Sequence, residues 1–225
     1  MIRPKINSGQ KHRFEEERAR RILMYCIPVR YRNAELSESP DIIVPDLSIG
    51  TEVTECFRQT FQQNMSRARN ITGKVNKELS GIDKKNIREQ NVFVHGLPNG
   101  QLMAGVILWG DPHDLMVAYS KKLKKLNEHH FKHYEENDLF IFAWLIEEDE
   151  LAKGVSEIIY SLNLPTEYKY SFDNIYIYKE TLLVHICAKN QSVNHLCVPS
   201  EVMTSISEES FLKIMGVTRD EYYLR

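Results

Sequence analysis

The clearest structural signal in this chain lies in two neighbouring stretches, Pro40-Asp41-Ile42-Ile43-Val44 and Ile49-Gly50-Thr51-Glu52-Val53-Thr54. The first is a short apolar run bounded by prolines at 40 and 45, which is typical of a short strand. The second is rich in β-branched residues, which favour strands. Turn-forming residues at 45–48 separate the two. We therefore predict a β-hairpin here.

This hairpin would bring two carboxylates together. Neighbouring strands lie about 5 Å apart, so Asp41 at the start of one strand and Glu52 on the other would reach the same divalent cation. Side chains alternate along a strand, so Glu52 and Thr54 share one face and Val53 lies on the opposite face. Carboxylates suit Mg²⁺, and a metal held by them assists phosphodiester hydrolysis. In the alternative interpretation, Asp41 is a turn residue and Glu52 faces solvent.

The rest of the chain alternates between helical and strand-like patterns. Helical periodicity is present in four segments: 13–27, 113–136, 153–163 and 205–215. Strand-like patterns occupy 29–32, 92–95, 102–109, 139–146 and 175–186, with a turn at Lys179-Glu180. Residues 139–146 are apolar without alternation, which indicates a central strand covered on both faces. We predict one α/β (α+β) domain over residues 1–225, a mixed central sheet flanked by helices, with a helical or hairpin insertion at about 57–110.

The amphipathic helix predicted at 13–27 carries three acids, Glu15, Glu16 and Glu17, at its start. The helix dipole alone explains acids in a first turn. Its arginines, Arg18, Arg20 and Arg21, lie on the outer face and would either contact phosphates or pair with the glutamates one turn away. Both interpretations stay open at this point.

Composition excludes several classes of protein. The chain has 225 residues with 29 Lys+Arg against 31 Asp+Glu, so it lacks the strongly basic balance of a nucleic-acid coat protein. Its four cysteines are scattered without a CxxC pair, which argues against a disulfide scaffold or a cysteine zinc site. No segment matches a membrane span, a signal peptide, a Walker A loop or a GxSxG elbow. We expect a cytoplasmic protein without a membrane partner.

The motif Pro40-Asp41 followed by Ile49-Gly50-Thr51-Glu52-Val53-Thr54-Glu55, after a helix bearing glutamates, resembles the PD-(D/E)xK nuclease superfamily. It is most similar to members with an IGxEVTE-type strand. The resemblance implies a restriction-endonuclease-like fold, a Mg (or Mn) cofactor and DNA as substrate. It also implies that Asp41 and Glu52 bind the metal with the carbonyl of Val53, and that Glu15 is the helical glutamate, with Glu16 as its substitute.

One position departs from the superfamily pattern. The lysine expected two residues after the second acid is Thr54, which cannot supply a positive charge. Lys122 is the candidate replacement, because it lies on the otherwise apolar face of the 113–136 helix; the alternative is a lysine that extends from the edge of that face to solvent. The catalytic set expected from the sequence is thus Glu15, Asp41, Glu52 and Lys122.

Two further interpretations follow from the sequence. His129 and His133 have the i, i+4 spacing of some zinc sites, but no HExxH motif accompanies them, and a solvated helix end explains them better. If no cation reaches the carboxylates, the chain would be a catalytically inactive nuclease-like domain that binds nucleic acid or protein. The leading expectation is a Mg-dependent nuclease acting on DNA.

Overall fold

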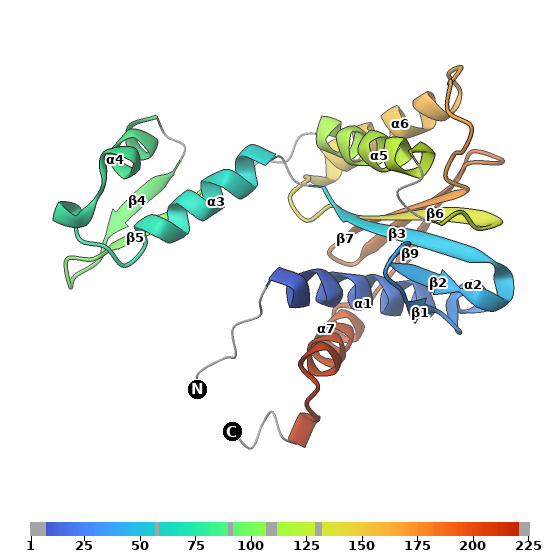
Figure 1. Ribbon diagram of the computed structural model, residues 1–225, viewed down its shortest axis with the longest axis horizontal. Coiled ribbons are helices and arrows are strands. Elements are labelled where there is room, and N and C mark those ends of the chain that lie inside the picture. Colours follow the sequence, from blue (N-terminus) through green and yellow to red (C-terminus); the bar gives the residue numbers. More distant parts are fainter. Residues whose placement is uncertain (1–7, 57–58, 90–91, 107–111, 129–131, 221–225) are drawn as a thin grey trace.

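The computed structural model describes residues 8–56, 59–89, 92–106, 112–128 and 132–220 (Figure 1). In this part of the chain a seven-stranded mixed sheet has the order β1-β2-β3-β6-β7-β8-β9. Its strands are β1 Glu35–Leu36, β2 Ile42–Val44, β3 Ile49–Glu55, β6 Glu136–Phe142, β7 Asn174–Lys179, β8 Leu182–Cys187 and β9 Ser192–Cys197. The helices are α1 Ser8–Cys26, α2 Pro28–Tyr31, α3 Gln59–Ile71, α4 Gly81–Arg88, α5 Pro112–Asn127, α6 Glu148–Leu162 and α7 Ser200–Met215. The mixed α/β sheet flanked by helices that the sequence predicts is confirmed.

The centre of the sheet is parallel and its flanks are antiparallel. Strand β6 runs parallel to β3 on one side and to β7 on the other, while the β1-β2-β3 and β7-β8-β9 connections are antiparallel. The central strand predicted at 139–146 is confirmed as β6, with residues 139–142 fully buried, but it begins at Glu136 and ends at Phe142. The hairpins predicted at 40–54 and around Lys179-Glu180 are also confirmed.

Two apolar cores cover the two faces of this sheet. On one face, β3 and β6 pack Val53, Phe140 and Phe142 against α1 and α7. On the other face, Leu139 and Ile141 pack against α5 and α6. Figure 1 shows these helix pairs on opposite sides of the sheet. Because side chains alternate along β3, Glu52 lies on the face that α5 covers.

Several elements differ from the sequence-based predictions. Residues 29–32 were expected to form a strand, but Pro28 occupies the first turn of α2, where its fixed φ and missing N–H suit a helix start. Helix α5 ends at Asn127, before the predicted end at 136. Helix α1 begins at Ser8, so Glu15, Glu16 and Glu17 lie mid-helix and the first-turn explanation for these acids is wrong.

Residues 59–106 form a lobe with its own small core, which we call the inserted lobe. It contains α3, the short 3-10 helix η2 (Asn76–Glu78), α4, and an antiparallel pair made by β4 (Phe93–Gly96) and β5 (Leu102–Gly105). Its core consists of Ala68, Ile71, Val92 and Leu102. Figure 1 shows it extending to one side of the seven-stranded sheet. The predicted extension of the second strand to Trp109 lies outside the described residues.

No helix in the described part of the chain is long and apolar enough to span a membrane.

Candidate active site

The β2–β3 hairpin places Asp41 opposite Glu52. The register pairs Ile42 with Thr51, so the next pair of positions toward the start of β2 is Asp41 and Glu52. The backbone N–H of Val53 donates a hydrogen bond to Oδ2 of Asp41 at 2.7 Å. The Asp41 side chain thereby adds one hydrogen bond between the β2 and β3 segments beyond the last backbone pair. This bond fixes the position of Asp41 relative to β3.

Gly50 allows the close approach that holds Asp41 in place. A Cβ at this position would lie 2.8 Å from Cγ of Pro40 and 2.6 Å from Cδ2 of Tyr134. Distances this short do not occur between real Cβ atoms and their neighbours, so only glycine fits here. Gly50 therefore allows Pro40, the residue before Asp41, to pack against β3.

Lys122 reaches the hairpin from α5. Its Nζ lies 2.5 Å from Oε2 of Glu52. Their side chains are 16% and 8% exposed, so most of this ion pair is shielded from water. The proximity of Lys122 to the Glu52 carboxylate, predicted from the sequence, is thus present in the structure. Lys122 on α5 thus brings an ammonium group to the site, whereas Thr54, at the expected lysine position, has none. The catalytic role of Lys122 stays a prediction.

The site carboxylates are electrostatically linked. Burial raises the pKa of Glu52, Lys122 opposes this, and the charge of Asp41 raises it further. Burial likewise raises the pKa of Asp41, while Lys122 and the hydrogen bond from Val53 lower it. The pKa values of both carboxyl groups are raised because burial disfavours their negative charge. A further positive charge next to them would therefore be favourable.

Helix α1 brings Glu16 to this site. Burial raises the pKa of Glu16; Arg13 opposes the rise, Glu38 and Glu52 add to it, and Lys122 lowers it. Oε2 of Glu16 is buried and accepts no hydrogen bond within the described residues, although Nη1 of Arg13 lies 3.5 Å away. Glu16 therefore lies in the electrostatic field of the Glu52–Lys122 pair.

Glu15, the first choice from the sequence, lies in different surroundings. Its Oε2 accepts a hydrogen bond from Nη1 of Arg18 at 3.0 Å. Burial raises its pKa, Arg18 and Lys11 lower it, and Glu55 raises it. Glu52 and Lys122 are among the main influences on the pKa of Glu16, the substitute, so the structure favours Glu16 as the glutamate of the site.

The donor set fits a hard divalent cation. Asp41 and Glu52 supply carboxylate oxygens, and the carbonyl of Val53 points to the same strand edge as its N–H, toward Asp41. Within the described ranges no group of three or more His, Cys, Asp or Glu side chains is arranged to hold a metal ion. Carboxylate and carbonyl oxygens are the ligands that Mg²⁺ or Mn²⁺ with retained waters would accept.

The remaining candidates from the sequence have structural partners or are not described. His129 lies outside the described residues, and Nε2 of His133 is 2.9 Å from the backbone oxygen of Leu126. The arginines of α1 pair with its own glutamates: Arg18 with Glu15, Arg20 with Glu17 and Arg21 with Glu17. Pairing within the helix, one of the two open interpretations, is thus what the structure shows.

Sequence reasoning missed a second buried polar cluster, centred on Asp138. Oδ2 of Asp138 accepts hydrogen bonds from the hydroxyl of Tyr31 at 2.6 Å and from Nη2 of Arg30 at 3.0 Å. Oδ1 accepts bonds from the backbone and side-chain amides of Asn174. Burial raises the pKa of Asp138 to about 6. Because both oxygens are satisfied within the protein, this cluster fixes α2 to the sheet rather than presenting a free site.

No family model matches this chain, and neither a curated protein nor a solved structure matches it. A functional conclusion therefore rests on the geometry of Asp41, Glu52, Lys122 and Glu16.

Proposed function

We propose that this chain is a metal-dependent nuclease that hydrolyses phosphodiester bonds in DNA. One observation carries the proposal: Lys122 approaches Glu52 to 2.5 Å on the hairpin that places Asp41 opposite Glu52. Two carboxylates and an ammonium group, largely buried together, are the groups that phosphodiester hydrolysis requires for metal binding and charge stabilisation. The resemblance of Pro40-Asp41 and residues 49–55 to the PD-(D/E)xK pattern, from which Thr54 departs, supports the same proposal.

Each residue has a specific role in this proposal. Asp41, Glu52 and the carbonyl of Val53 would hold Mg²⁺ or Mn²⁺, and the ion would supply Lewis-acid activation of water and of the phosphate. In the hydrolysis the water oxygen bonds to phosphorus while the bond to the leaving oxygen breaks, and the proton lost by water balances the one gained by the leaving group. Lys122 orients the water and offsets the negative charge that accumulates on the phosphate. Glu16 accepts a hydrogen bond from water at the same site.

A second candidate is supported by the same ion pair. Lys122 forms an ion pair with Glu52, and such a pair is also what a domain would need if it had kept the fold but lost metal binding. Such a domain would bind nucleic acid or protein without cutting. Turnover separates the two candidates.

Cleavage of supercoiled and linear DNA in MgCl₂ or MnCl₂ tests the proposal. The unsubstituted chain should cut, EDTA should stop the reaction, and Asp41→Asn or Glu52→Gln should lower the rate on the order of 10²-fold or more. Glu55→Gln is the matched control, because Glu55 ends the same strand but pairs with Lys11 at 3.4 Å. Binding without cutting supports the inactive domain, and equal cutting by all variants refutes this site.

A further inference from the structure

The inserted lobe is net positive, whereas the rest of the chain, taken as a whole, is net negative. Residues 59–106 contain seven basic and three acidic side chains, whereas the whole chain has 29 Lys+Arg against 31 Asp+Glu. The remainder of the protein is therefore net negative. The basic residues are Arg67, Arg69, Lys74, Lys77, Lys84, Lys85 and Arg88. Clustered positive charge on an acidic protein marks a surface for an anionic partner.

The seven basic side chains of the lobe differ in their partners. Lys74 pairs with Asp83 at 2.8 Å, Lys85 lies 3.8 Å from Glu89, and Arg67 donates a hydrogen bond to Asn64. The other four are exposed and form no ion pair within the described part of the chain; they are Arg69, Lys77, Lys84 and Arg88. Lys84 and Arg88 lie one turn apart on α4, whose buried side faces the other way with Asp83 and Asn86.

The lobe is joined directly to both elements that carry the candidate site. It follows β3, and α3 begins at Gln59, seven positions after Glu52. At about 3.4 Å per position this distance is at most ~24 Å. It rejoins the body at α5, where Lys122 lies ten residues beyond Pro112, or about 15 Å along the helix. One turn of duplex DNA is about 34 Å. DNA bound at Glu52 would therefore extend beyond the base of the lobe.

We propose that the inserted lobe is a phosphate-binding arm that contacts the DNA backbone beside the scissile phosphate. The contacts come from Arg69, Lys77, Lys84 and Arg88. This inference rests on the proposed nuclease function, because DNA is the polyanion that the site would cut. The contacts are electrostatic and independent of base sequence, so the arm adds affinity and length of footprint but no sequence preference.

Salt-dependent binding of the full chain to a labelled 30-base-pair duplex, measured by fluorescence anisotropy in EDTA, tests the arm. The variant Arg69→Ala/Lys77→Ala/Lys84→Ala/Arg88→Ala should bind at least about tenfold more weakly at low salt. Its plot of log affinity against log salt should be flatter by on the order of 0.9 per lost phosphate contact, up to ~3.6 for four. All four side chains are exposed, so thermal unfolding should be unchanged.

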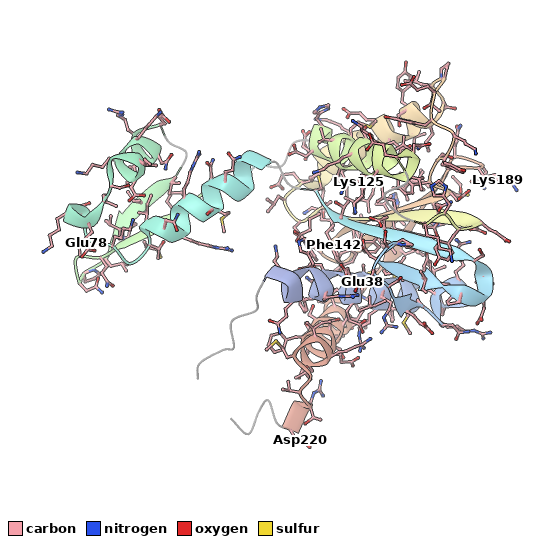
Figure 2. The ribbon with its side chains drawn as sticks, viewed as in Figure 1. Glu38, Glu78, Lys125, Phe142, Lys189 and Asp220 are labelled. Atoms are coloured by element: carbon pink, nitrogen blue, oxygen red, sulfur yellow. The ribbon has the colours of Figure 1, made fainter. Side chains whose placement is uncertain are left out.

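A matched control removes four exposed charges from the opposite end of the sheet, where β3, β6 and β7 begin. The variant is Arg32→Ala/Lys132→Ala/Lys169→Ala/Lys189→Ala. Figure 2 shows Lys189 on the side of the body away from the lobe, which carries Glu78. This variant lowers the net charge equally and should keep both the affinity and the salt slope of the unsubstituted chain.

The outcomes separate the arm from the nuclease. If the lobe variant and the control have equal salt slopes, or if the unsubstituted chain does not bind the duplex, the arm is refuted. If the lobe variant alone loses affinity while no DNA is cut in Mg²⁺, the arm stands and the proposed catalysis fails. If the lobe variant cuts DNA and binds it with undiminished affinity, the proposed catalysis stands and the arm is refuted.

Discussion

Replacing Lys122 by Met would remove the ammonium and keep an unbranched apolar side chain of similar length at this position of α5. The lost group lies 2.5 Å from Oε2 of Glu52, and a positioned charge of this kind contributes on the order of 10²–10³ in rate, or about 3–4 kcal/mol. Breaking a buried ion pair costs at most about 3–5 kcal/mol of stability. Protonation of Glu52 would reduce this cost, because Lys122 is the main influence lowering the pKa of Glu52.

Cleavage and metal binding should therefore respond differently to Lys122→Met. We expect the cleavage rate in MnCl₂ to fall on the order of 10²–10³-fold. Mn²⁺ affinity measured by calorimetry should not fall, because lysine is not a ligand and its loss releases a Glu52 oxygen. Lys121→Met, the exposed neighbour on α5, is the control and should behave like the unsubstituted chain. Normal cutting by Lys122→Met, or a loss of Mn²⁺ affinity equal to that of Glu52→Gln, would refute the assignment.

Three further predictions concern titratable groups. Glu16→Gln should slow cleavage at least about tenfold, while Glu15→Gln should not. The reverse pattern in the same assay would show that Glu15, and not Glu16, is the helical glutamate of the site. Glu17 is fully buried, and its pKa is lowered from 4.5 to about 2. Its ionised carboxylate therefore stabilises the fold at pH values above 4.5, the pKa in the unfolded chain. Glu17→Gln should lower the unfolding free energy at pH 7 by about 3 kcal/mol. This deficit should vanish as pH falls from 5 to 2 in denaturant titrations, and a constant deficit would contradict the reasoning. Because the pKa values of Asp41 and Glu52 are raised, Mn²⁺ affinity should increase with pH above 4.5 with proton release, and calorimetry in two buffers showing no release would contradict it.

The hairpin and the central strand could be predicted because their signals are local. Pro40 and Gly50 mark the ends and the close approach of β2 and β3, and the alternation of Glu52 and Val53 assigns each to one face. Lys122 could be proposed as a site residue because a charged side chain on the apolar face of a helix indicates a specific partner, whichever element that face packs against. In each case a pattern within a few residues was enough.

Other features depended on packing between distant segments. Neighbouring helix positions differ by about 100°, so the edge of an apolar stripe does not decide between Glu15 and Glu16. The charges of Glu52 on β3 and Lys122 on α5, which act on Glu16, favour Glu16. Strand β9 was not predicted, because Ser192–Cys197 is a largely exposed edge strand with polar residues, and it is defined by pairing with β8. The Asp138 cluster joins α2, β6 and β7, which no local pattern connects.

Anomalous X-ray scattering from crystals soaked in MnCl₂ would locate the metal ion. We expect a peak between Asp41 and Glu52, with carboxylate oxygens at about 2.0–2.2 Å and the carbonyl of Val53 facing the ion, and the loss of this peak in Glu52→Gln crystals. Data from crystals that bind Mn²⁺ only elsewhere, or that keep the Lys122–Glu52 pair closed with no ion at any soak concentration, would contradict a metal-dependent nuclease site.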